Sequence, residues 1–125
     1  MILRNKQEVS LKNFYKEFLS HVSNSLPSNR RLTKMELEVL TEFWALEGEL
    51  VELDRFSTSV KKHIRENVFK FKNYTGLENY ISQLYKKGYI VKKDGKKIIN
   101  PNYDLPKERI RNQGKFTLVY EYEIA

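Results

Sequence analysis

The chain has 125 residues, of which 40% are hydrophobic and 13% aromatic, enough to form a domain with a packed core. It contains no cysteine, which excludes disulfides and thiolate zinc sites. No apolar run approaches the roughly 18–20 residues of a membrane-spanning helix, and the N-terminus is not typical of a signal peptide. We therefore expect a protein of a reducing compartment, the cytoplasm, with no membrane partner.

Positive charge is concentrated in one third of the sequence. The net charge is +7, and a basic balance most often indicates a polyanionic partner such as nucleic acid. Residues 35–54 contain seven acidic residues and no lysine or arginine, whereas residues 55–97 contain twelve basic residues and three acidic ones. Charge that served only solubility would rarely be sorted in this way. The distribution therefore favours a nucleic-acid-binding face within residues 55–97.

The first element in chain order is an amphipathic helix over residues 8–26, because its apolar residues recur at spacings of three and four. Pro27 ends it. Thr33 and Glu36 then form a capping-box pattern, which predicts the start of a second helix.

The second helix carries most of the acidic residues, and Gly48 is expected to weaken or end it. Phe43 and Trp44 are expected in the core. The acidic residues are expected on the far face, directed to solvent or to a protein partner. Residues 49–56 fit a turn, a short strand or a continued helix.

Two further helices are predicted in the basic third of the chain. Ser57 or Ser59 can cap the first of them, whose apolar stripe consists of Val60, Ile64 and Val68. The next helix runs from about residue 77 to residue 87, and Gly88 is its expected C-terminal stop. The residues of this helix that are expected to face inward are Leu77, Tyr80, Ile81, Leu84 and Tyr85.

A β-hairpin and a final strand complete the predicted elements. The β-prone runs 89–91 and 97–99 flank an Asp94-Gly95 pair, which is a strong signal for a two-residue hairpin turn. Residues 101–114 are predicted to be a connecting segment. Apolar and polar residues then alternate over 116–124, which predicts a strand.

The order of three helices and a hairpin over residues 32–101 resembles the winged helix-turn-helix family of phage and plasmid regulators and replication proteins. The strings that carry the resemblance are LTKMELEVL (32–40), FSTSVKKHIRENV (56–68), LENYISQLYKKGYI (77–90) and KKDGKKIINP (92–101). The resemblance implies an α+β fold, with residues 1–31 as an N-terminal helical extension. Residues 102–125 would be a connecting segment and a C-terminal strand packed on the same domain. The connection between Val68 and Leu77 is longer than the turn usual in this motif.

In this arrangement the helix over residues 77–87 would enter the major groove of duplex DNA, and its outward side chains would reach the base edges. The candidate base-reading residues are Asn79, Ser82, Gln83 and Lys86. The candidate DNA-backbone contacts are Lys61, Lys62, Arg65, Lys70, Lys72, Lys87, Lys92, Lys93, Lys96 and Lys97. Glu78 would repel phosphates and counts against this face.

Other function classes find less support in the sequence. Neither histidine has a partner at metal-ligand spacing, and no phosphate-binding loop or nucleophile motif occurs, so we expect no metal, cofactor, small-molecule substrate or enzymatic activity. The aromatic residues fall at core spacing, which favours DNA over RNA.

Two questions stay open. The N-terminal helix could form a homodimer seam, and the C-terminal strand could add to another subunit's sheet. Alternatively, both elements could thicken the core of a monomer. The fold could also serve protein contacts, as in a phage virion or assembly protein located in the virion.

Overall fold

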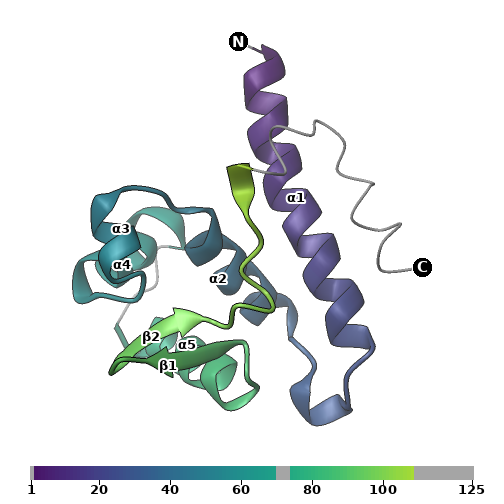
Figure 1. Ribbon diagram of the computed structural model, residues 1–125, viewed down its shortest axis with the longest axis vertical. Coiled ribbons are helices and arrows are strands. Elements are labelled where there is room, and N and C mark those ends of the chain that lie inside the picture. Colours follow the sequence, from purple (N-terminus) through teal and green to yellow (C-terminus); the bar gives the residue numbers. More distant parts are fainter. Residues whose placement is uncertain (1, 70–73, 109–125) are drawn as a thin grey trace.

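The computed structural model describes residues 2–69 and 74–108 (Figure 1). Within these residues the fold is α+β, with five α-helices and one two-stranded antiparallel hairpin. The elements are α1 (Ile2–Asn24), η1 (Ser28–Arg30), α2 (Lys34–Ala45), α3 (Glu49–Leu53), α4 (Thr58–His63), η2 (Ile64–Val68), α5 (Tyr74–Lys86), β1 (Ile90–Lys93) and β2 (Lys96–Ile99). Across the described ranges, no helix combines the length and the apolar character that a membrane span needs.

The long helix α1 begins earlier than predicted and packs against α2 of the same chain. Its buried side chains are Leu11, Phe14, Tyr15, Phe18 and Leu19. Two ion pairs join the helices, because Lys12 lies 3.1 Å from Glu42 and Lys16 lies 2.9 Å from Glu38. The prediction that the acidic residues of α2 point to solvent or to a partner is therefore wrong for these two, and also for Glu36, which is buried and pairs with Lys87. The lysines of α1, distant in sequence, lie against Glu38 and Glu42.

Helix α2 begins at the predicted capping box. The Thr33 hydroxyl accepts a hydrogen bond from the Glu36 amide, and the Glu36 carboxylate accepts one from the Thr33 amide. Phe43 and Trp44 are fully buried, as predicted. At the other end of the helix, the Arg55 guanidinium donates to the carbonyl of Phe43 at 2.6 Å, which satisfies a carbonyl that the helix itself leaves unpaired.

The ambiguous segment after Gly48 forms the short helix α3, in which Val51 is buried. Ser57, and not Ser59, caps α4: its hydroxyl accepts from the Val60 amide. The predicted apolar stripe then holds for Val60 and Ile64 but is wrong for Val68, which is 37% exposed.

A π-helical turn explains the exposed Val68. In η2 the Phe69 amide donates to the Ile64 carbonyl five residues earlier, so the turn is wider than an α-helical one. A residue four positions after Ile64 therefore no longer returns to the same face, and Phe69 packs against the core instead.

Helix α5 starts at Tyr74, three residues before the predicted start, so residues 69–73 separate it from η2. Its buried side chains are Leu77, Ile81 and Leu84, as predicted. Tyr80 is half-buried, and the prediction that Tyr85 faces inward is wrong, because this residue is 40% exposed. Gly88 has a φ of +90°, the left-handed conformation expected of a glycine that ends a helix.

The hairpin has the predicted two-residue turn. Asp94 and Gly95 both have positive φ, 53° and 80°, as a type I′ turn requires. The register places Ile90 opposite Ile99, and both are buried against α5 and the core.

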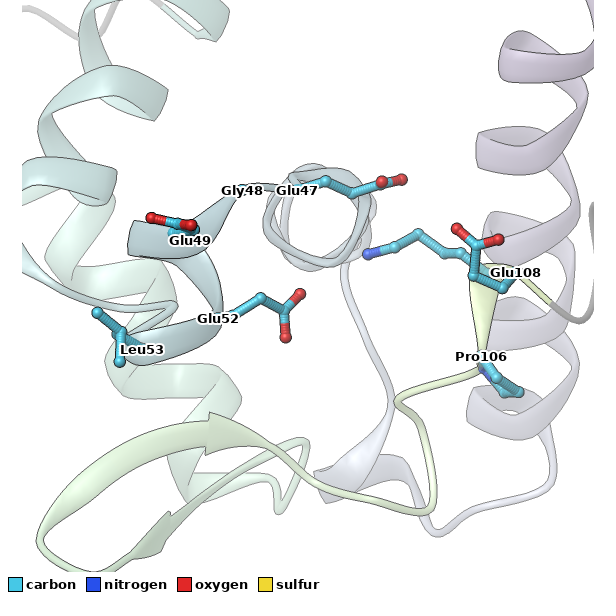
Figure 2. Close-up of a pocket in the computed structure, with 8 residues that line it drawn as sticks. Glu47, Gly48, Glu49, Glu52, Leu53, Pro106 and Glu108 are labelled. Carbon is cyan, nitrogen blue, oxygen red and sulfur yellow. The ribbon is translucent and has the colours of Figure 1, made fainter.

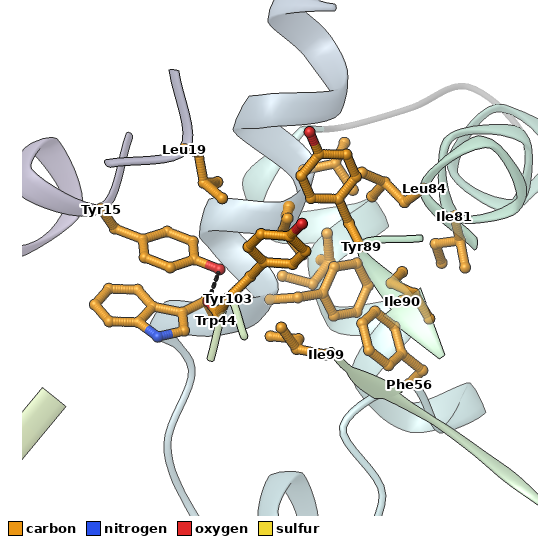
Figure 3. Packing of buried hydrophobic residues seen from close by; sticks show 14 of the residues in the cluster. Tyr15, Leu19, Trp44, Phe56, Ile81, Leu84, Tyr89, Ile90, Ile99 and Tyr103 are labelled. Atoms are coloured by element: carbon orange, nitrogen blue, oxygen red, sulfur yellow. Dashed lines mark hydrogen bonds between the residues drawn. The ribbon is translucent and has the colours of Figure 1, made fainter. Parts of the chain in front are cut away.

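One hydrophobic cluster runs from Leu11 to Tyr103, so the N-terminal helix and the following elements share a single core (Figure 3). The rings of Tyr15 and Trp44 are stacked with centroids 4.0 Å apart. The Tyr15 hydroxyl donates to the Tyr103 carbonyl at 2.6 Å, and the Trp44 indole donates to the Leu105 carbonyl at 3.0 Å. Residues 103–105 are thereby held against α1 and α2. The predicted strand over 116–124 lies outside the described residues.

The buried Tyr15 predicts a loss of stability at alkaline pH. Burial, and to a lesser degree the Asp104 carboxylate, raises the pKa of the Tyr15 phenol well above its ordinary value of 10.0. Above about pH 10 the unfolded chain therefore loses a proton that the folded chain keeps. The contribution of this group is complete below about pH 10 and falls by about 1.4 kcal/mol per pH unit above it.

We expect Tyr15→Phe to be about 1 kcal/mol less stable than the wild type near pH 8, because the hydrogen bond to Tyr103 is lost. Between about pH 10 and pH 11, however, the variant should lose less stability than the wild type. Urea unfolding followed by circular dichroism measures both quantities. Equal alkaline slopes for the two proteins would show that Tyr15 does not set this pH dependence.

Candidate nucleic-acid interface

The outward face of α5 carries the four residues predicted to read bases. Asn79, Gln83 and Lys86 are exposed and Ser82 is half-buried. They share one face because Leu77, Ile81 and Leu84 hold the opposite face in the core. The helix thus presents amide, hydroxyl and ammonium groups along one side.

The cations of α4 and η2 lie beside this helix. The Lys61 ammonium is 2.8 Å from the Glu78 carboxylate, which joins α4 to α5. Glu78, which the sequence alone presents as an obstacle to phosphate, therefore has its charge offset by a neighbouring helix. Lys62 is exposed, and the Arg65 guanidinium is 3.2 Å from Glu66.

The hairpin carries four lysines in two cross-strand pairs, Lys92 with Lys97 and Lys93 with Lys96. Three of these side chains are exposed and that of Lys97 is half-buried. Like charges placed directly opposite each other on antiparallel strands destabilise a hairpin. The arrangement therefore concentrates positive charge at a cost in stability.

Tyr85 lies where α5 meets the hairpin, and sequence reasoning missed it. The ammonium groups of Lys92 and Lys97 lie 5.8 and 5.5 Å from the centroid of its ring, within the range of cation–π attraction. Helix geometry could have indicated its position. Tyr85 follows the inward-facing Leu84 by one residue and is therefore rotated about 100° from it around the helix axis. It therefore lies on the flank of α5 and not on its buried face.

Lys87 has partners within the chain. Its ammonium donates to the Glu36 carboxylate at 2.6 Å and to the Arg31 carbonyl at 2.8 Å, and only 15% of its side chain is exposed. The Arg30 guanidinium donates to the carbonyl of Lys87 at 3.2 Å. These contacts tie the end of α5 to the start of α2. A phosphate contact by Lys87 would have to compete with them.

Two of the predicted backbone contacts, Lys70 and Lys72, lie outside the described residues. Among the residues that the structure does describe, no three histidine, aspartate or glutamate side chains gather as a metal site would require.

No protein-family model, curated protein or solved structure matches this chain.

Proposed function

We propose that this protein is a winged helix-turn-helix protein that binds double-stranded DNA. In this proposal α2, α4 with η2, and α5 are the three helices, and β1 and β2 form the wing. Helix α5 is the recognition helix. The order of the elements and the position of the hairpin beside α5 (Figure 1) support this assignment.

The observation that carries the proposal is that four lysines of the hairpin lie opposite one another as two cross-strand pairs. Four ammonium groups at the tip of a two-stranded ribbon repel one another, and Asp94 is the one acidic residue within the segment 92–97 that carries them. Phosphate groups would relieve that repulsion, and their neutralisation releases counterions, which supplies most of the affinity of basic proteins for DNA. Tyr85 would hold Lys92 and Lys97 toward the groove that α5 enters.

The exposed face of α5 supplies the groups that would distinguish sequences. An α-helix fits the major groove, where asparagine and glutamine side chains can form two hydrogen bonds with adenine. Asn79 and Gln83 are four residues apart and exposed on the same face. Lys62 and Arg65 would contact the phosphates that flank the groove. We infer a transcription or replication regulator of the phage or plasmid type from the resemblance noted above.

The direct test is a titration of labelled duplex DNA with the wild-type protein at about 50 and 200 mM salt. We expect binding at low salt that weakens steeply at the higher concentration, because several phosphate contacts are made. Binding weaker than roughly millimolar at low salt would contradict the proposal, since even non-specific DNA binding is normally tighter than this.

The base-reading residues can be tested after selection of a preferred sequence from random duplexes. Asn79→Ala/Gln83→Ala should bind the selected duplex about 10- to 100-fold more weakly, because one or two bidentate contacts worth about 1–3 kcal/mol each are lost. Binding of an unrelated duplex should change little. An equal loss of affinity for both duplexes would show that these residues contact the DNA phosphate backbone and do not read bases.

A further inference from the structure

The short helix α3 exposes two large apolar side chains on one face. Leu50 is 69% exposed and Leu53 is 70% exposed, whereas Val51 between them is buried and anchors the helix. Among the described residues the other exposed large hydrophobic side chains are Val68 and Tyr85. Single exposed apolar residues are ordinary, but a contiguous pair held on a helix is typical of an interaction surface.

The surface on both sides of these leucines is hollowed. Leu53 lines a hollow of about 670 Å³ between α3 and the segment from Pro106 to Glu108. Figure 2 shows Glu52 directed from α3 into this hollow. Leu50 lines a second hollow of about 480 Å³ between α3 and α4. Apolar side chains of a partner would therefore find space beside each leucine.

The described side chains that line the two hollows are mainly acidic although the chain as a whole is basic, because Lys107 is the one lysine or arginine among them. A second cation, the Lys96 ammonium, borders Leu53 on the hairpin side, 3.5 Å from the Leu53 carbonyl. Glu47, Glu49 and Glu52 come from the same turn and helix, and all three are exposed. Glu52 keeps 69% of its side chain exposed even though Arg55 lies 3.6 Å away. We call Leu50, Leu53 and these three glutamates the α3 patch.

We infer that the α3 patch docks a cationic amphipathic segment of a partner protein, whose apolar side chains cover the leucines and whose lysines or arginines pair with the glutamates. The three glutamates would repel phosphate groups, which disfavours DNA as the occupant of the patch. It also disfavours a second copy of this chain, because a two-fold contact would set the glutamates of one copy against those of the other. The inference does not depend on the proposed DNA binding.

The probe is a synthetic 18-residue peptide of leucine and lysine at helical spacing, labelled for fluorescence anisotropy and titrated with the full-length protein at about 150 mM salt. We expect saturable binding, with amide shifts in NMR spectra concentrated at residues 47–53. Leu50→Ser/Leu53→Ser should weaken binding about 100-fold, because each leucine buried by the peptide contributes about tenfold to the affinity. Glu49→Gln/Glu52→Gln should also weaken it.

Val68→Ser is the matched control, since it removes an exposed apolar side chain elsewhere and should leave peptide affinity unchanged. Thermal melts confirm that the variants stay folded. The inference would be overturned if the leucine variant bound the peptide as well as the wild type does. It would also be overturned if a peptide with serine in place of leucine bound equally well, because binding would then depend on charge alone. Self-association of the wild type that the leucine variant lacks would assign the patch to a second copy and overturn it as well.

Discussion

Replacing Lys92, Lys93, Lys96 and Lys97 with alanine is expected to remove a large part of the salt dependence of DNA binding. Each phosphate that a lysine neutralises adds about 0.9 to the magnitude of the negative slope of log affinity against log salt. Four lost contacts would therefore lower that magnitude by about 3 to 4. Across a fourfold increase in salt, the wild type should lose about 100-fold more affinity than the variant.

This variant should remain folded, because the four side chains lie on a hairpin whose attachment to the core depends on Ile90 and Ile99. Removing two opposed pairs of like charges should, if anything, stabilise the hairpin. A suitable control is Lys12→Ala/Lys16→Ala/Lys34→Ala, which lowers the net charge on α1 and α2. If the salt dependence of DNA affinity falls equally in the control and in the hairpin variant, the fall comes from the lower net charge. The hairpin would then not be the phosphate contact.

Trp44→Ala should cause the largest loss of stability of any single substitution considered for this chain. Trp44 is fully buried, its ring stacks on Tyr15 with centroids 4.0 Å apart, and its indole donates to the Leu105 carbonyl. Lys107 lies 5.1 Å from the ring centroid. Truncation leaves a cavity where α1, α2 and residues 103–107 meet. We expect the free energy of unfolding to fall by about 3–5 kcal/mol.

That loss is a large part of the roughly 5–15 kcal/mol that stabilises an ordinary domain. Urea unfolding should be followed by circular dichroism, because Trp44 is the single tryptophan and its fluorescence disappears in the variant. Trp44→Phe keeps a stacked ring but loses the hydrogen bond, and we expect it to cost about 1–2 kcal/mol. A loss below about 1 kcal/mol for Trp44→Ala would mean that α1 does not pack on α2 as described.

Much of the fold could be predicted because the signals are local. The capping box of Thr33 and Glu36 and the turn at Asp94-Gly95 each involve residues within a few positions of one another. The buried face of α5 followed from helical periodicity in the same way. The outward position of Asn79 and Gln83 is the complement of that face, so the sequence placed these candidates together correctly.

The errors fall where the helical register changes, or where a residue's surroundings come from a distant part of the chain. Val68 is exposed because a π-helical turn shifts the register of η2, and periodicity assumes an unbroken α-helix. Tyr85 is on the flank of α5, where the hairpin lysines, and not the core, lie against it. Lys87 has the composition of a phosphate contact, yet its ammonium pairs with Glu36.

By itself the sequence determined the four main helices, the hairpin turn, the sorting of charge and most of the apolar faces, because each depends on short-range spacing and backbone preference. Only the tertiary structure decided what those faces meet. It set the acidic residues of α2 against the lysines of α1, placed Tyr85 beneath Lys92 and Lys97, and left Leu50 and Leu53 on the surface. Side-chain burial and ion pairing depend on which elements pack together, and residues far apart in the sequence determine that packing.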